Sequence, residues 1–336
     1  MALDALTVAV TGVTGTFGTS LVPLLEADER VGRVVGVSRR PPDHGDPDVE
    51  FRSGDVRDLP SLVESFVGAD VVVHLAFLIV GNAAPATLRE TNVVGTLNAF
   101  RAAVAVGARR FVLASSLAAY GFGPDLPIGI PEQHPVRPGD RFFYAAEKAE
   151  TEQALAAEAA EHPEIEVYVL RPCGVVGPNA LGGKDLAPGR FAPAARRLAE
   201  RVLRARLPLP LPVPVPALRL QLVHHDDVGE ALHRAVVADG PPGTYNIAGD
   251  GVVTLVDLVR EFGAAPIPLP EAVAQVPARI LTALPLPPPL QWIEAGTHPL
   301  IMDTTRARTR LGWRPRYSGL DAWRDTLRPA SGPRRP

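Results

Sequence analysis

The chain has 336 residues, of which 46% are hydrophobic and 21% are charged, and its formal net charge is −3. This composition is typical of a folded globular protein, and so small a net charge gives no electrostatic basis for binding nucleic acid or an anionic membrane. The single cysteine, Cys173, excludes an intramolecular disulfide framework, so we expect a reducing, cytoplasmic compartment. We also expect neither a signal peptide nor a transmembrane span.

Predicted strands and helices alternate in the first half of the chain. Residues 6–11 are a continuous apolar and β-branched run, which predicts a buried strand, and a glycine-rich turn and a helix over 17–28 follow. Further strands are predicted at 34–38, 71–75, 111–115 and 167–170, with helices near 60–67, 86–106 and 144–161. This alternation predicts an α/β fold, a Rossmann-type doubly wound parallel sheet with helices on both faces.

The pattern changes after Arg171. Residues 174–220 are rich in glycine and proline, with a helix near 190–206, and residues 207–216 alternate proline with leucine or valine. Alternating proline forbids a helix and most strand pairing, so this stretch is either an extended arm crossing a substrate cleft or a packed connector. Short strands at 220–223 and 244–247 are expected to return to the sheet, before a helix at 255–262.

Three units follow from this pass along the chain. The expected dinucleotide-binding domain is 1–173, with returning segments near 220–248. A smaller, proline-rich substrate lobe comprises 174–219 and 249–327, and 328–336 is a flexible tail.

The turn after the first strand carries glycines at positions 12, 15 and 18. Gly12 allows the tight turn, Gly15 lets the backbone approach a pyrophosphate, and Gly18 allows close packing of helix on strand. The helix N-terminus supplies amide donors and partial positive charge. We therefore expect the whole turn to bind a dinucleotide, including Thr14, Thr16 and Phe17.

The residues after the second strand bear on the choice of cofactor. They are Ser38, Arg39 and Arg40, with no carboxylate to bind a ribose 2′-hydroxyl. An arginine there accommodates a 2′-phosphate, so we favour NADP over NAD, the alternative being that both arginines are solvated loop charges. Asp55, followed by Val56, is expected either to contact the adenine or to act as a helix N-cap.

Tyr144 and Lys148 are four residues apart at the start of a predicted helix, so their side chains share one face. An ammonium beside a phenol favours the phenolate and is expected to lower the tyrosine pKa from about 10. Lys148 and Lys184 are the only lysines among 34 basic residues, which suggests a specific need for a compact charge at position 148.

At this point the chain resembles the extended short-chain dehydrogenase/reductase family, whose best-known branch contains NAD-dependent epimerases and dehydratases. The resemblance runs from Thr11 to about Pro315. Its motifs stand in order at 11–18, Asp55, 74–76, 91–96, 115–121, Tyr144 with Lys148, 170–178, 223–228, 245–249 and 311–315.

The resemblance implies a role for each matching residue. Tyr144 exchanges a proton with the substrate oxygen, Ser116 hydrogen-bonds the same oxygen, and Lys148 lowers the tyrosine pKa and binds the nicotinamide ribose. Asn92 helps to position the lysine. The alternatives are that Ser115 or Ser116 only caps a strand end, and that Asn92 only bonds the backbone. Further cofactor contacts are implied at Leu75, Ala76, Pro172, Cys173, Gly174 and Val175. No metal is implied, and helices 86–106 and 144–161 resemble the pair that forms a homodimer interface.

The chain departs from the nucleotide-sugar members of that family. Gly174 and Leu220 stand where those members carry an Asn and an Arg, and residues 294–299 lack a late arginine. Leu117 and Ala118 replace the acidic pair of sugar dehydratases. The second half is rich in Leu, Pro and Val, which suits a less polar substrate.

We therefore expect an NAD(P)-dependent oxidoreductase. It would transfer hydride reversibly between a nicotinamide and a ketone or secondary alcohol of a small-molecule metabolite. The alternatives are a nucleotide-sugar 4-epimerase with tightly bound NAD, which would use the same Ser, Tyr and Lys, and a non-catalytic NADP-sensing regulator.

Overall fold

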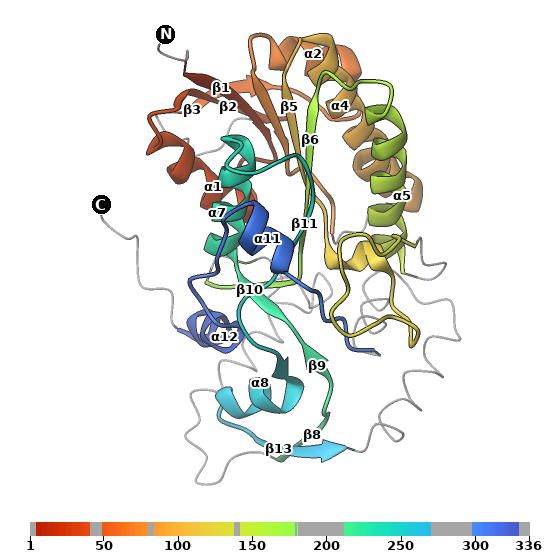
Figure 1. Cartoon of the computed structure of the whole chain (residues 1–336), viewed down its shortest axis with the longest axis vertical. Coiled ribbons are helices and arrows are strands. Elements are labelled where there is room, and N and C mark those ends of the chain that lie inside the picture. The colour runs from red at the N-terminus through yellow and green to blue at the C-terminus, as the bar shows by residue number, and fades with distance from the viewer. Residues whose placement is uncertain are drawn as a thin grey trace.

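A seven-stranded sheet forms the centre of the computed structural model, which describes residues 5–40, 49–79, 84–137, 142–178, 180, 212–269 and 298–328 (Figure 1). The strand order is β11-β6-β5-β4-β1-β2-β3, and every neighbouring pair is parallel. The predicted fold class is thus confirmed. The strands are β1 (Leu6–Thr11), β2 (Val31–Ser38), β3 (Val49–Ser53), β4 (Val71–His74), β5 (Arg110–Ala114), β6 (Glu166–Pro172) and β11 (Gly243–Ile247).

Helices cover both faces of the sheet. On one face lie α1 (Thr16–Glu26) and α7 (His225–Val236), and on the other lie α2 (Leu59–Phe66), α4 (Gly95–Ala105) and α5 (Phe143–Ala159) (Figure 1). Alternate residues of β1 belong to different cores: Val8 and Val10 pack on the α1 side, and Ala9 on the α2 side. Strands buried on both faces require continuous apolar runs, which is why the sequence pattern located them.

The helix predicted over 86–106 is interrupted. It consists of α3 (Pro85–Arg89), a π-helical turn η1 (Glu90–Val94) and α4. Turns of this kind are rare and occur often at functional sites. Here the π-helical turn contains Asn92, one of the predicted site residues.

The returning strands differ in part from expectation. Only β11 joins the large sheet. The strand expected at 220–223 is divided into β9 (Arg219–Leu220) and β10 (Leu222–His224), and the prediction that it returns to the sheet is wrong. β10 pairs with β7 (Gly174–Val176), and β9 pairs with β12 (Val253–Thr254), each as a separate two-stranded sheet.

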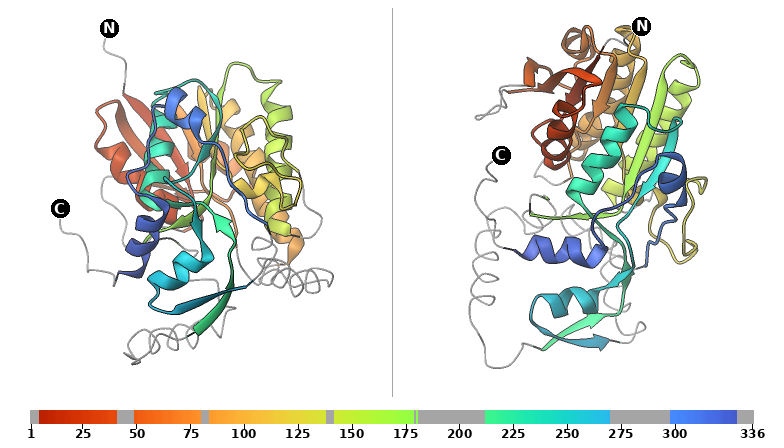
Figure 2. Two further views of the ribbon diagram at one scale, coloured as in Figure 1. Left: turned by 60° about the horizontal axis from the view of Figure 1, so that its bottom comes forward. Right: turned by 60° about the vertical axis from the view of Figure 1, so that its left-hand side comes forward.

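The remaining elements include η2 (Leu117–Tyr120), α8 (Leu255–Glu261), α11 (Thr305–Arg310) and α12 (Gly319–Leu327). Two further views show α8, β8 (Pro212–Pro216) and β13 (Ala265–Leu269) at the end of the described structure away from β1 (Figure 2). The helix predicted near 190–206 and the tail beyond 328 lie outside the described residues. Within the described ranges, no helix has the length and apolarity needed to cross a membrane.

The proline-alternating stretch forms a strand, contrary to expectation. The structure describes it from residue 212 onward, where β8 (Pro212–Pro216) pairs in parallel with β13 (Ala265–Leu269). In a parallel ladder, one residue of each bridged pair directs both its N–H and its C=O toward the other strand, and its partner directs neither. The bonding residue belongs to one strand in one pair and to the other strand in the next pair. All five prolines, at 212, 214, 216, 266 and 268, face a non-proline partner, so each can occupy the position whose N–H is not needed.

This register predicts opposite effects for neighbouring substitutions. Val213→Pro removes an N–H that the ladder requires, and it should weaken the β8–β13 pairing by about 1–3 kcal/mol. Pro214→Ala, the matched control, restores only an outward N–H and should leave the pairing intact. Amide hydrogen exchange at Ile267 and Leu269 measures the difference. Equal protection in the two variants would contradict the proposed register of hydrogen bonds.

Candidate active site

The glycine turn lies against the carboxyl end of β4. Gly12 has a φ of +68°, and a Cβ on it would lie 2.8 Å from the backbone nitrogen of Ala76. A Cβ on Gly18 would lie 2.0 Å from the Val13 carbonyl oxygen. Gly15 is the N-cap of α1 and has no side chain to satisfy the first amides of that helix. Those N–H groups and the helix dipole fit an anionic pyrophosphate.

Thr11 and His74 connect this turn to β4. Thr11 Oγ1 lies 2.9 Å from His74 Nδ1, and it accepts hydrogen bonds from the amides of Leu75 and Ala76. Burial lowers the pKa of His74 to about 3, with a smaller contribution from Lys148. The imidazole is therefore neutral at physiological pH. Leu75 and Ala76 lie beside the glycine turn, as the resemblance implies.

The side chains expected to contact the adenosine part of the cofactor lie at the carboxyl ends of β2 and β3. Arg39 and Arg40 are exposed, and the Ser38 hydroxyl donates to the carbonyl of Arg40 at 2.6 Å. Hydrogen bonds from Arg57 lower the pKa of Asp55, and the charge of Arg39 contributes to the same effect. Arg39 and Arg57 therefore both lie close to the Asp55 carboxylate.

Asp55 does not cap a helix, so that alternative is wrong. Its carboxylate forms an ion pair with Arg57 at 2.6 Å, whereas the N-cap of α2 is Asp58, which accepts from the Ser61 amide. The neighbouring Val56 carbonyl accepts a hydrogen bond from Asn98 at 3.1 Å, which fixes this turn against α4.

Ser116, Tyr144 and Lys148 converge at the carboxyl end of β5. Tyr144 lies in the first turn of α5 and forms a side-chain hydrogen bond with Ser116. Lys148 lies one turn later, and its Nζ donates to the Ala114 carbonyl at 2.8 Å. The ammonium is 3.6 Å from the centre of the Phe77 ring and 5.9 Å from that of Tyr144. Ser116 also accepts from the Ala118 amide and so caps η2, and its predicted site role stays a prediction.

The expected lowering of the Tyr144 pKa is not found. Burial raises the pKa of Tyr144, and the hydrogen bond with Ser116 opposes this only in part. Burial also lowers the pKa of Lys148 to about 7, against the attraction of Glu152 and Glu147. The expectation from spacing failed because removal from water outweighs the effect of one group on the other.

Asn92 acts through its neighbours. Its Oδ1 accepts from the Leu78 amide at 2.7 Å, and its Nδ2 donates to the Leu78 carbonyl and to Glu147 Oε2. The side chain therefore fixes the segment after β4 against α5. Because Glu147 directly precedes Lys148, these contacts join the segment after β4 to the helix that carries the lysine.

The last four predicted cofactor residues, 172–175, lie at the end of β6 and the start of β7. The amide of Cys173 donates to Ile247 of β11 at 2.9 Å, and burial raises the pKa of the Cys173 thiol, so the thiol stays protonated at neutral pH. Pro172 ends β6, and Gly174 and Val175 begin β7. All four therefore lie at the same end of the sheet as the glycine turn.

The sequence analysis did not predict a buried network that lies beside Ser116, Tyr144 and Lys148. Glu152 accepts from Ser115 and from Arg171, and the side chains of this ion pair are each 6% exposed. Arg171 also donates to Tyr120 at 2.7 Å, and Tyr120 donates to Asn246 at the same distance. One pattern in the sequence could have indicated it, because Glu152 lies four residues after Lys148 on the same helix face.

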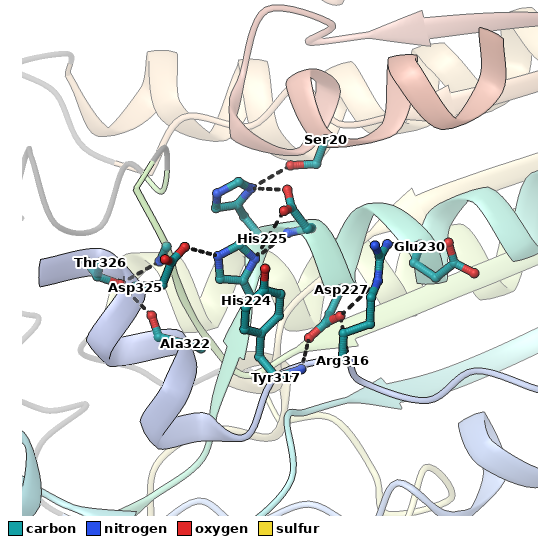
Figure 3. A network of polar contacts seen from close by, with 12 residues as sticks. Ser20, His224, His225, Asp227, Glu230, Arg316, Tyr317, Ala322, Asp325 and Thr326 are labelled. Carbon is teal, nitrogen blue, oxygen red and sulfur yellow. Dashed lines mark hydrogen bonds and ion pairs between the residues drawn. The ribbon is translucent and has the colours of Figure 1, made fainter. Parts of the chain in front are cut away.

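Figure 3 shows a second network, which joins α1, α7 and α12. His224 Nδ1 accepts from the Asp226 amide, and its Nε2 lies 3.2 Å from Asp325. His225 Nδ1 lies 2.7 Å from the Ser20 hydroxyl. His224, His225 and Asp226 are close enough together to bind a metal ion, but the ring nitrogens nearest Asp226 already have hydrogen-bond partners. We therefore assign these residues a structural role.

Residues 8–248 match the NAD dependent epimerase/dehydratase family. The match covers well over half of the chain, which therefore belongs to this family. With the glycine turn and the Ser116, Tyr144 and Lys148 group, this membership supports an enzyme of the oxidoreductase or epimerase kind that binds NAD.

Three comparisons illustrate the range of similar proteins. An uncharacterized protein of Mycobacterium tuberculosis is 28% identical over 96% of this chain and 83% of its own length. Sterol demethylase protein B of Methylococcus capsulatus is 33% identical over 56% of this chain and 61% of its own length. A crystal structure of UDP-glucose 4-epimerase from Thermotoga maritima has a TM-score of 0.68 at 22% identity, covering 95% of this chain and 97% of that one, which shows a shared fold.

The lowered pKa of Lys148 predicts a specific dependence of stability on pH. Below pH 7, the lysine is charged in both the folded and the unfolded chain, and the full cost of burying the ammonium weakens the fold. Between about 7 and 10.5 the unfolded chain binds more protons than the folded chain, so the free energy of unfolding rises with pH.

Chemical denaturation of the wild type and of Lys148→Met across this range tests the prediction. The difference in the free energy of unfolding should move in favour of the wild type as pH increases. A constant difference would show that the Lys148 pKa is not lowered.

Proposed function

We propose that this protein is an NAD(P)-dependent oxidoreductase that transfers hydride reversibly between a nicotinamide and a ketone or secondary alcohol of a small metabolite. One observation carries the proposal. Ser116, Tyr144 and Lys148 come together at the carboxyl end of β5. The glycine turn follows the carboxyl end of β1 in the same parallel sheet. Ligands of open α/β sheets bind at this end of the strands.

The side chains have separate tasks in this proposal. The hydroxyls of Ser116 and Tyr144 bind the substrate oxygen, and Tyr144 moves the proton. Because burial raises its pKa, Tyr144 retains its proton at neutral pH and acts as the acid when a ketone is reduced. The bound nicotinamide supplies or accepts the hydride. Lys148, with a pKa of about 7, can gain or lose a proton near neutral pH and would bind the nicotinamide ribose.

We infer a preference for NADP over NAD from the residues after β2. The exposed Arg39 and Arg40 and the absence of a carboxylate at 38–40 support it, and NAD remains the alternative because the family is NAD-dependent. We also propose a cytoplasmic homodimer, on the single cysteine and on the resemblance of the α4 and α5 region to a dimerising helix pair.

A nucleotide-sugar 4-epimerase is the second candidate, favoured by the name of the family. It would use the same Ser116, Tyr144 and Lys148, and would return the hydride to the same substrate. Gly174 and Leu220, which replace the expected Asn and Arg, weigh against it. Arg219 adjoins Leu220 in β9, and neighbouring residues of a strand point to opposite faces. A regulator without activity is the third candidate, disfavoured because Tyr144 and Lys148 are both present.

Tyr144→Phe tests the catalytic assignment. Removing only the phenolic oxygen should lower kcat by about a hundredfold or more and leave the dissociation constant for the cofactor within a few fold. Ketone-dependent oxidation of NADPH or NADH, followed by nicotinamide absorbance, measures turnover, and calorimetry measures binding. Full turnover in the variant would refute the assignment and revive the regulator. Interconversion of sugar epimers without a net absorbance change would favour the epimerase.

Arg39→Ala tests the cofactor preference. Loss of a charge-assisted contact with a 2′-phosphate should weaken NADP binding by about tenfold or more and leave NAD binding nearly unchanged. Arg33→Ala is a matched control, because Arg33 is an exposed arginine near the other end of β2, where it pairs with Glu50. Tighter binding of NAD than of NADP by the wild type, unaffected by Arg39→Ala, would contradict the preference.

A further inference from the structure

The side chains around Tyr144 narrow the class of substrate, an inference that rests on the proposed function. We propose that the substrate is an apolar ketone or secondary alcohol, in which hydrocarbon groups flank the reacting carbon on both sides. Aliphatic, alicyclic and aryl ketones belong to this class, and sugars do not.

Aromatic rings surround the catalytic phenol. The Phe77 ring meets Tyr144 edge-on at 5.6 Å between centroids, and the Phe142 ring lies 5.9 Å away. Phe122 continues the group, 5.7 Å from Phe142. These rings come from three separate segments, after β4, after η2 and at the start of α5. Together with Ala118, Ala145, Ile79 and Phe143 they form an apolar cluster beside the cores of the sheet, and Phe122 also packs against the core on the α1 side.

The cluster keeps accessible apolar surface. Phe77, Phe122 and Ile79 are only partly buried, whereas Phe142 is buried. A partly open aromatic surface beside a catalytic group is typical of a ligand pocket. By contrast, phenylalanines of the sheet core, such as Phe66 and Phe111, are fully buried.

The polar groups in this part of the described structure have little capacity left for a second substrate hydroxyl. The hydroxyls of Ser116 and Tyr144 are assigned to the single reacting oxygen. The Lys148 ammonium donates to Ala114, lies 3.6 Å from the centre of the Phe77 ring, and in the proposed function directs its remaining N–H groups to the nicotinamide ribose. Leu117 and Ala118, directly after Ser116, have no polar side-chain atom.

This arrangement discriminates between two chemically different neighbours of a carbonyl. A hydroxyl buried against a phenyl ring without a partner should lower kcat/KM by roughly tenfold or more. A methylene in the same place should raise it by about fourfold. A hexopyranose that reacts at C4 carries a hydroxyl on C3 and the ring oxygen with a hydroxymethyl group on C5, so a polar group meets the rings on each side of its reacting carbon.

Diethyl ketone and dihydroxyacetone make a matched test, since a methyl group in one replaces a hydroxyl in the other at each end. With the full chain and NADPH or NADH, we expect kcat/KM for diethyl ketone to exceed that for dihydroxyacetone by about a hundredfold or more. Acetone, butanone and diethyl ketone should form a rising series of about fourfold per methylene. A flat series, or a preference for dihydroxyacetone, would overturn the inference.

Substitution of one ring tests whether this cluster is the cause. Phe77→Asn should lower kcat/KM for diethyl ketone by about tenfold or more while changing that for dihydroxyacetone far less. Phe262→Asn is the control, because Phe262 packs on Trp323 beyond the end of α8 and should change neither value. Equal losses for both ketones in Phe77→Asn would show general damage and refute the assignment.

The results of these experiments distinguish a failure of the apolar-substrate inference from a failure of the proposed oxidoreductase function. Reduction of ketones without preference for hydrocarbon groups would refute the apolar class and leave the oxidoreductase standing. No reduction of any ketone, together with epimerisation of a UDP-hexose, would refute the proposed function itself. No turnover of either kind would contradict both.

Discussion

The buried ion pair between Glu152 and Arg171 is the interaction on which the arrangement of Ser116, Tyr144 and Lys148 depends. Both side chains are almost entirely removed from water, and such charges are tolerated only when they are paired and hydrogen-bonded. Glu152 lies one turn after Lys148, and it accepts from Ser115, which precedes Ser116. The pair therefore fixes α5 against the end of β5. Removal of one partner typically costs about 3–5 kcal/mol, because the other charge remains buried.

Burial also determines the acid–base properties of the site. It raises the pKa of Tyr144 and lowers that of Lys148, so burial favours the neutral form of each side chain. The same rings that exclude water supply the apolar surface proposed to bind the substrate. One feature of packing would thus give both a proton-retaining phenol and the proposed selectivity for hydrocarbon, because a low-dielectric surface disfavours charges and unpaired hydroxyls alike.

Much of the fold and the site could be predicted from the sequence, since local rules determine them. The first strand falls on residues 6–11 as predicted, and Ser116 and Tyr144 are brought together. The π-helical turn at Asn92, the division of 220–223 and the pairing of 212–216 were not predictable, because each depends on which distant segment packs alongside. The pKa of Tyr144 was predicted in the wrong direction for the same reason. Spacing along a helix reports which groups are near one another, but not how much water surrounds them.

Residues of the C-terminal segment contact the region around His224 and His225 (Figure 3). The Trp313 indole donates to the Asp227 carbonyl, and the Asp227 carboxylate accepts from the amides of Arg316 and Tyr317. Tyr317 then stacks on His224 at 4.1 Å, and His225 contacts Ser20 within α1. Residues near the end of the chain thus support the helix whose first turn is proposed to bind pyrophosphate. A motif at 311–315 that carries no reactive group has a clear physical role here, because it fixes the position of α7 and, through His225, that of α1.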